Sequence, residues 1–227
     1  MKRVVLGVCA HPDDLEFAAA GTVAKFTKVG ADCYYLICTN GCKGTSDARI
    51  SESKLIRIRR EEQRNAGRII GLKNVFFLDN NDTELVADMQ LKKDIVRYIR
   101  MLKPDTVIAS DPSFIYSDRY INHADHRAAG LAAMDAVYPL ARDRLTFREL
   151  EKEGLKPHKV KELLIVNSDR PNYFVDISST MGQKIKALAA HKSQISKSSI
   201  EFAEKRAKEL GKKNGCRYAE AFFRIRL

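Results

Sequence analysis

The chain has 227 residues, of which 44% are hydrophobic and 30% charged, with only 6 Pro and 12 Gly. This composition excludes a disordered or low-complexity chain, and no apolar run approaches the roughly 20 residues that a membrane span requires. Lys and Arg total 40 against 29 Asp and Glu, which gives a net charge of +11 and makes a nucleic-acid-binding protein one class to consider.

Apolar runs of strand length alternate with segments of helical periodicity. In chain order, strands are expected at 4–9, 33–38, 75–78, 106–109, 162–166 and 173–175, and helices at 15–28, 54–70, 88–102, from about 124, at 181–191 and at 200–210. The polar segments 39–47 and 110–122 are predicted loops. This alternation predicts a three-layer, Rossmann-like α/β fold with a mostly parallel sheet flanked by helices. No repeat or linker divides the chain, so one domain over residues 1–227 is expected.

The N-terminus resembles a signal peptide only superficially. A basic start precedes an apolar run, but that run ends before His11 and no cleavage region follows. We therefore expect a first core strand and a cytoplasmic protein. The 5 cysteines form no CxxC pair, so reduced structural thiols are expected rather than disulfides or a zinc ribbon.

Two polar clusters follow strands of the predicted sheet. The first strand runs directly into residues 11–14, and the loop after the fourth strand leads to residues 122–126. Ligands of such sheets bind beyond the carboxyl ends of the strands. Both clusters are therefore expected at one edge of the sheet, close to each other.

The two clusters together carry the donors of a catalytic metal site. His11, Asp14 and His126 form a set of two imidazoles and one carboxylate, which leaves a zinc site open for water and substrate. A metal held in this way acidifies its water and polarises a carbonyl oxygen. Asp13 is then the candidate general base.

The remaining side chains complete a set for amide hydrolysis. We expect His123, as an imidazolium, to stabilise an oxyanion or to protonate a leaving amine, with Asp125 behind it to hold its orientation. An Asp pair before a helix is also typical of a simple N-cap, so Asp13 and Asp14 alone would indicate little. Capping does not account for two such clusters at equivalent strand ends.

These motifs resemble those of the PIG-L/LmbE-type zinc-dependent N-deacetylases, which remove acetyl from N-acetylglucosamine-type sugars. The carrying residues are the sequence HPDDxE from His11 and HxDH from His123. Further matches along most of the chain are Gly21-Thr22, the segment from Arg59 to Gly71, Asp82-Thr83-Glu84-Leu85, Lys192-Ser193-Gln194 and Ala219-Glu220-Ala221-Phe222.

The resemblance implies a role for each matching residue. It implies one Zn²⁺ per chain, held by His11, Asp14 and His126, with Asp13 as base, His123 as oxyanion stabiliser and Asp125 behind it. It further implies that Arg59 and Asp82 hold sugar hydroxyls. It also implies a substrate-binding role for His191, which could act across a subunit interface. The chain is then expected to form a homo-oligomer, a trimer or a hexamer. The expected substrate is a small amino-sugar conjugate, whose second group would be selected by the loops 40–52 and 110–122.

The chain departs from the family pattern in the second cluster. Ala124 stands where Pro is commoner, and Ile121 stands where a Tyr is frequent. Tyr116 or Tyr120 is therefore the candidate for any contribution of a tyrosine to the oxyanion.

Two other classes compete with the deacetylase. A metallo-β-lactamase-like phosphodiesterase would need a His at position 121, which is occupied by Ile121. A non-enzymatic nucleic-acid or nucleotide-binding protein would depend on the basic segments 54–68 and 205–226. Aromatic residues are scarce among these basic residues and the chain has no Trp, so no nucleic-acid partner is expected.

Overall fold

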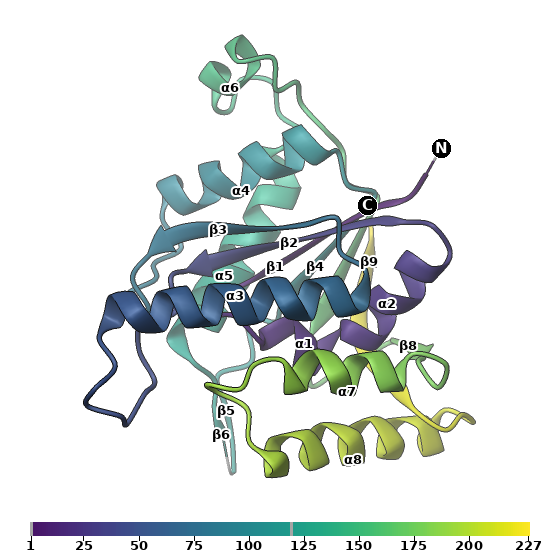
Figure 1. Cartoon of the computed structure of the whole chain (residues 1–227). Helices are drawn as coiled ribbons and strands as arrows, with labels where there is room; N and C mark the ends of the chain where they lie inside the picture. Colours follow the sequence, from purple (N-terminus) through teal and green to yellow (C-terminus); the bar gives the residue numbers. More distant parts are fainter. Residues whose placement is uncertain (1, 119) are drawn as a thin grey trace.

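The structure is a computed structural model that describes residues 2–118 and 120–227. A seven-stranded sheet runs through it in the order β3-β2-β1-β4-β7-β9-β8 (Figure 1). Its strands are β1 (Val4–Cys9), β2 (Asp32–Thr39), β3 (Asn74–Asn80), β4 (Thr106–Ser110), β7 (Glu162–Val166), β8 (Tyr173–Asp176) and β9 (Ala219–Arg226). A separate hairpin pairs β5 (Tyr116–Ser117) with β6 (Tyr120–Ile121).

The sheet is mostly parallel, as the sequence predicts. Strands β3, β2, β1, β4 and β7 are parallel to one another, and β9 runs antiparallel to both β7 and β8. The central strands β1 and β4 are buried on both faces, which is why their sequences are almost continuously apolar. The segment 219–226, which the sequence analysis placed in a basic tail, instead forms β9 inside the sheet.

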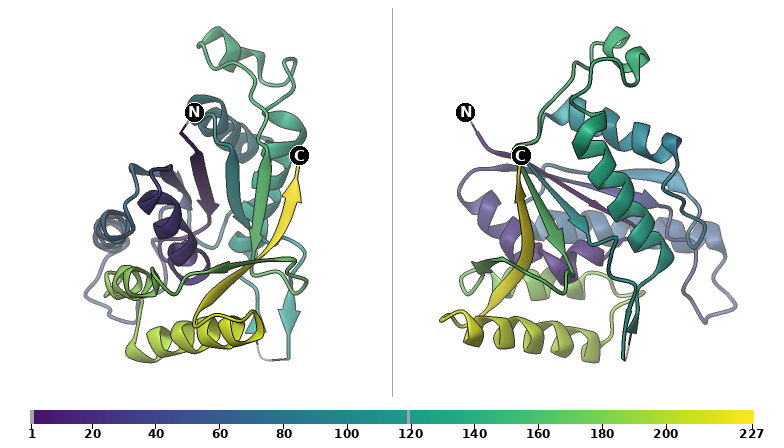
Figure 2. Two further views of the ribbon diagram at one scale, coloured as in Figure 1. Left: turned by 90° about the vertical axis from the view of Figure 1, so that its right-hand side faces the viewer. Right: turned by 180° about the vertical axis from the view of Figure 1, so that it is seen from behind.

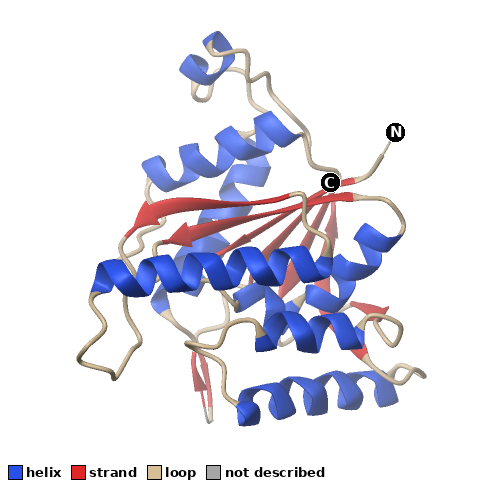
Figure 3. Cartoon of the chain, in the orientation of Figure 1, coloured by secondary structure: helices blue, strands red, loops and turns tan. Residues whose placement is uncertain are grey.

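Helices cover both faces of the sheet (Figures 2 and 3). They are α1 (Asp14–Ala18), α2 (Ala20–Lys28), α3 (Glu52–Ile70), α4 (Met89–Leu102), α5 (Ala124–Asp135), the turn η1 (Ala136–Leu140), α6 (Arg148–Lys152), α7 (Met181–Ala189) and α8 (Lys197–Lys213). One core, which includes Val23 and Ile70, lies under α1, α2, α3 and α7, and a second, which includes Ile95 and Ile99, lies under α4 and α5. Within the described residues, no helix is long and apolar enough to cross a membrane.

One helix predicted over residues 15–28 is two helices. The carboxylate of Glu220 accepts hydrogen bonds from the backbone N–H groups of Gly21 at 3.0 Å and Thr22 at 2.7 Å, so it satisfies the start of a new helix. Lys184 donates to the carbonyl of Phe17 at 2.5 Å, which satisfies the end of the first helix. The chain is therefore interrupted between α1 and α2 by partners that come from β9 and α7.

The topology creates a crevice between β1 and β4. Strand β1 has β2 on one side and β4 on the other, and the chain visits β3 before it returns to β4. The connections after β1 and β4 therefore leave toward opposite faces of the sheet, which opens the ligand-binding edge of a doubly wound fold. This is the edge at which residues 11–14 and 122–126 lie.

Candidate active site

The first cluster forms the turn between β1 and α1. Asp13 adopts a left-handed backbone conformation, with φ of 86°, and occupies the N-cap position of α1 without a side-chain capping bond. The alternative of a simple N-cap is therefore not supported for Asp13, because its carboxylate makes no capping hydrogen bond to α1. The carboxylate of Asp14 turns back instead and accepts a hydrogen bond from the backbone N–H of His11 at 2.9 Å.

The second cluster lies at the start of α5. His123 is the N-cap residue, and its Nδ1 accepts a hydrogen bond from the backbone N–H of Asp125 at 3.1 Å. One turn into the helix, His126 points toward the first cluster. The rings of His11 and His126 lie 5.2 Å apart, and those of His11 and His123 lie 4.9 Å apart.

Three donor atoms from the two clusters face one another. Nδ1 of His11 lies 3.2 Å from Nε2 of His126 and 3.9 Å from Oδ2 of Asp14. Nε2 of His126 lies 3.0 Å from Oδ1 of Asp14. The structure thus brings together the three residues that the sequence analysis proposed as metal ligands, and they form a candidate metal site.

The outer nitrogen of His11 is held by two carboxylates. Nε2 lies 3.1 Å from Oδ2 of Asp125 and 3.1 Å from Oδ1 of Asp82, both of which are buried. Such carboxylates fix the tautomer of a ligating histidine by accepting its outer proton. Burial alone would lower the pKa of His11, but the hydrogen bonds to Asp125 and Asp82 outweigh it and raise the pKa to about 10.

The outer nitrogen of His126 is fixed in a similar way by Asn122. Nδ1 of His126 lies 3.1 Å from Oδ1 of Asn122, and the amide of Asn122 is itself oriented because its Nδ2 donates to the carbonyl of Phe114 at 2.8 Å. In the neutral ring, Nδ1 of His126 therefore carries the proton, and Nε2 has its lone pair toward the centre of the site. Asn122 had no assigned role from the sequence, although it lies in the second cluster.

The donor set fits a divalent cation. The inner nitrogens of His11 and His126 lie 3.2 Å apart, and that of His126 lies 3.0 Å from an oxygen of Asp14. Burial would raise the pKa of Asp14, but the two imidazoles lower it well below its usual range, so this oxygen is anionic. Two imidazoles, neutral once a cation displaces their inner protons, and one carboxylate that converge in this way match the ligands that zinc takes in catalytic sites.

Asp125 is placed differently from its predicted position. Its Oδ1 lies 3.9 Å from Nδ1 of His123, whereas its Oδ2 lies 3.1 Å from His11. The backbone N–H groups of Thr83 and Leu85 also donate to this carboxylate, at 2.7 and 3.3 Å. Asp125 therefore orients His11 more directly than His123, and with Asp82 and the two histidines it forms a second group of potential metal-binding side chains.

His123 is expected to be neutral in this geometry. Burial, and then the neighbouring His11, lower its pKa. Its Nδ1 accepts a backbone hydrogen bond, so the proton of the neutral ring is on Nε2. The predicted imidazolium form is thus not the one that this hydrogen bond favours, and His123 offers an N–H donor instead.

Asp13 lies beside the donor set with an altered proton affinity. Burial, together with the adjacent charge of Asp14, raises its pKa to about 7, although Arg59 opposes this effect. Nη2 of Arg59 lies 3.9 Å from Oδ2 of Asp13. A carboxylate whose pKa is close to neutrality is suited to accept and return a proton.

The comparisons with known proteins agree with this geometry. Residues 6–137 match the family described as PIG-L: GlcNAc-PI de-N-acetylase. The diacetylchitobiose deacetylase of Thermococcus kodakarensis is 36% identical over 222 residues, which cover 96% of this chain and 81% of that protein. The chain belongs to the PIG-L/LmbE deacetylase family. The resemblance inferred from the motifs is thereby confirmed.

Two further relatives support the membership. The solved structure of the N,N'-diacetylchitobiose deacetylase from Pyrococcus horikoshii, in complex with an inhibitor, matches with a TM-score of 0.91 at 32% identity and covers 99% of this chain and 84% of that one. A probable N-acetyl-α-D-glucosaminyl L-malate deacetylase of Bacillus anthracis is 26% identical over 205 residues, which cover 86% of this chain and 82% of that protein. The predicted α/β fold is confirmed by the structural match.

Arg59 and Asp82 are bound to protein groups in this PIG-L/LmbE protein. Arg59 is 5% exposed, and it donates to the carbonyls of Gly41 at 3.1 Å and Pro12 at 3.4 Å. Its Nη1 also lies 3.5 Å from Oδ2 of Asp82, whose other oxygen faces His11. These contacts hold the loop 40–50 against the turn between β1 and α1, and a role in binding sugar hydroxyls stays a prediction.

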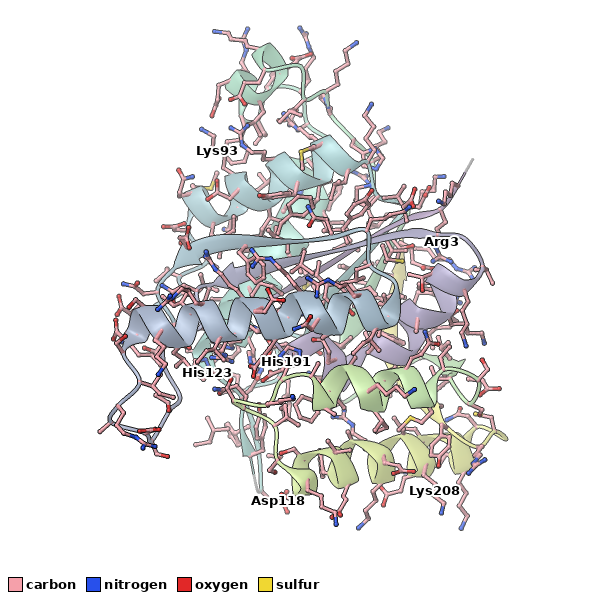
Figure 4. All side chains as sticks on the ribbon, viewed as in Figure 1. Arg3, Lys93, Asp118, His123, His191 and Lys208 are labelled. Carbon is pink, nitrogen blue, oxygen red and sulfur yellow. The ribbon has the colours of Figure 1, made fainter. Side chains whose placement is uncertain are left out.

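His191 does not join the substrate-facing residues. It follows α7 and lies between α7 and α3 in the view of Figure 4, where the half-buried His123 is also labelled. The side chain is 0% exposed, and its Nε2 lies 3.7 Å from Oε2 of Glu16. Burial lowers its pKa to about 4, so the ring is neutral. A side chain enclosed in this way does not support the predicted contact with substrate across an interface.

The sequence analysis assigned no role to two buried residues that lie next to the turn of Asp13. Gln63 of α3 and Glu16 of α1 are both 0% exposed, and Gln63 hydrogen-bonds the backbone of Asp13. Glu16 was part of the HPDDxE motif but received no role. The sequence carries no signal for Gln63, because its contact depends on how α3 packs against α1.

The loop 110–122 forms the hairpin β5–β6 beside the site. Tyr116, Tyr120 and Ile121 on this hairpin are exposed, and the ring of Tyr120 stacks on Phe114 with centroids 6.2 Å apart. Burial raises the pKa of Tyr120. The sequence analysis expected this segment to be an irregular loop, and the contribution of either tyrosine to the reaction stays a prediction.

Proposed function

We propose that this protein removes the acetyl group from an N-acetylglucosamine-type substrate and releases acetate. The observation that carries the proposal is the convergence of His11 Nδ1, His126 Nε2 and Asp14 on one point, with Asp13 directly beside them. Membership in the deacetylase family makes the protein an amide hydrolase, and the substrate class follows from the names of its relatives.

We further propose that one Zn²⁺ per chain occupies the site formed by His11, Asp14 and His126. The second group, around Asp82 and Asp125, is less suited to a metal because backbone N–H groups, Arg59 and the outer nitrogen of His11 already contact its oxygens. Those carboxylates instead orient His11. When bound, a zinc ion would supply Lewis-acid chemistry by acidifying a water and polarising the amide carbonyl.

The chain's own residues then divide the proton transfers. Asp13 accepts the proton of the attacking water, since its carboxylate is free of α1 and its pKa lies near 7. The Nε2–H of His123 donates a hydrogen bond to the oxygen that becomes negative as the tetrahedral intermediate forms. Because His123 is neutral, we assign the proton that the leaving amine needs to Asp13, which returns the one it has taken.

The decisive experiment combines acetate release with metal analysis. Purified protein loaded with zinc should release acetate from a panel of N-acetylglucosaminides that includes N,N'-diacetylchitobiose. Asp13→Asn should retain zinc and lose activity by about 100-fold or more, because only the proton acceptor is removed. Asp79→Asn is a matched control, since Asp79 is an exposed residue that pairs with Arg60 at the protein surface. Full activity in Asp13→Asn would overturn the assignment of the base.

We also propose that the protein is a cytoplasmic homo-oligomer, a trimer or a hexamer as the family resemblance implies. Exposed apolar side chains on the hairpin, including Ile115 and Ile121, support a buried contact there in solution. Light scattering coupled to size-exclusion chromatography tests this, and a monomer at micromolar concentration would contradict it.

A further inference from the structure

Gln63 links the turn that carries Asp13 to a second buried polar group. Its Oε1 accepts a hydrogen bond from the backbone N–H of Asp13 at 3.1 Å, and its Nε2 donates to Oε1 of Glu16 at 2.8 Å. The two bonds use opposite ends of one side-chain amide. The acceptor on Glu16 therefore determines which end of Gln63 faces Asp13.

The backbone of Asp13 needs such a partner. Its φ of 86° lies in the left-handed region, which costs energy for residues with a Cβ, although Asp tolerates it better than most. The side chain forms no capping bond that would compensate locally. The hydrogen bond from the Asp13 N–H to Gln63 thus opposes a return of this residue to an ordinary backbone conformation.

Glu16 in turn depends on Gln63. Both side chains are 0% exposed, and within the described part of the chain Oε2 of Glu16 has no hydrogen-bond partner, with His191 too distant at 3.7 Å. A buried carboxyl group is costly without donors, so the amide of Gln63 is a donor that Glu16 requires. Each of the two side chains therefore fixes the other.

We propose that Gln63, oriented by Glu16, is a positioning residue that holds the Asp13 carboxylate in its reactive orientation. This role rests on the proposed function of Asp13 as the base. Both side chains are enclosed, so their effect reaches the reaction through the angle at which Asp13 meets the water and not through substrate contact. Since a misplacement of about 1 Å at a reacting group costs about 100-fold in rate, the effect should fall on kcat and not on KM.

The first test replaces Gln63 by an apolar side chain of similar length. Gln63→Met removes both hydrogen bonds, and it should lower kcat by at least about 10-fold while KM stays within about 2-fold and the zinc content is unchanged. Gln183→Met is the matched control, because Gln183 of α7 donates to the carbonyl of Ile69 at 3.3 Å, away from the candidate active site. The control should leave kcat unchanged.

The second test reverses the hydrogen bond between the two side chains. Gln63→Glu alone sets two carboxyl groups against each other and removes the donor that Glu16 requires, so kcat should fall as in Gln63→Met. Adding Glu16→Gln provides a donor at position 16 and an acceptor at position 63, whose other oxygen still accepts from the Asp13 N–H. The double variant should recover kcat to within about 3-fold of the parent, which separates positioning from a need for the charge of Glu16.

The outcomes distinguish this inference from the assignment of the base. Unchanged kcat in Gln63→Met would overturn the positioning role, and so would a double variant no more active than Gln63→Glu, whether or not it folds. Recovery in the double variant supports the role even if Gln63→Met proves too unstable to assay. An active Asp13→Asn would instead overturn the base itself, independently of Gln63.

Discussion

Two buried clusters of charged side chains differ in whether their hydrogen bonds are complete. In the cluster of Lys184 and Glu220, the two side chains lie 2.6 Å apart, and each also bonds a backbone group of α1 or α2. In the candidate metal-binding cluster of His11, Asp14 and His126, the inner nitrogens of the two histidines lie 3.2 Å apart. In the first cluster a cation meets an anion, whereas the second brings together three potential metal ligands, so we call the first closed and the second open.

The difference shows that burial of charge alone does not indicate a functional site. Structural ion pairs also shift the pKa values of buried groups, so a buried Lys or Glu does not by itself indicate a functional site. What distinguishes the candidate active site is the convergence of three potential ligand atoms, from His11, Asp14 and His126, with the outer nitrogens of both histidines held by other side chains. The following predictions test this distinction between a closed and an open cluster.

Removal of one inner ligand should have the largest effect. His126→Ala takes away one of three donors, so the protein should lose its zinc and, with it, several kcal/mol of transition-state stabilisation, more than about 100-fold in kcat/KM. Atomic absorption on dialysed protein and acetate release measure the two effects. His158→Ala is the control, because His158 contacts the carbonyl of Pro104 at 2.8 Å, outside the candidate site. Retention of stoichiometric zinc by His126→Ala would refute the ligand assignment.

Breaking the closed cluster should affect stability instead of chemistry. Lys184→Met leaves the buried carboxylate of Glu220 without its cation, which should lower the free energy of unfolding by about 3–5 kcal/mol. Urea denaturation followed by circular dichroism measures this, with the exposed Lys186→Met on the same helix as control. The folded variant should keep its zinc and its kcat. A loss of kcat as large as that in Asp13→Asn would show that this cluster is not purely structural.

The sequence predicts the parts of the fold and site that depend on local pattern. The apolar runs of β1 and β4 identify the central strands, and the spacing within HPDDxE and HxDH identifies the candidate ligands. It misses β9 because alternating Arg residues in Ala219–Arg226 indicate a strand only once β7 and β8 provide partners. The break between α1 and α2 is missed for the same reason, since its cause is Glu220, far along the chain.

The roles of the supporting residues are also set by tertiary contacts. Sequence spacing placed Asp125 behind His123, two residues away, whereas the folded chain places its carboxylate against His11. Gln63 reaches Asp13 only because α3 packs beside α1. Local spacing therefore identifies the candidate ligands, but which groups orient them depends on elements that are distant in sequence.

The smallest of these effects concerns the residue that orients one ligand. Asn122→Ala keeps all three donors but removes the acceptor that fixes the Nδ1 proton of His126, and it also frees the carbonyl of Phe114. Loss of such an outer partner typically weakens metal affinity by about 10–100-fold, so saturating zinc should restore most of the activity. Competition with a chelator measures the affinity, and Asn65→Ala, on the exposed face of α3, is the control. Unchanged zinc affinity would mean that the tautomer of His126 is fixed by the cation alone, so that the open cluster is less preorganised than its hydrogen bonds indicate.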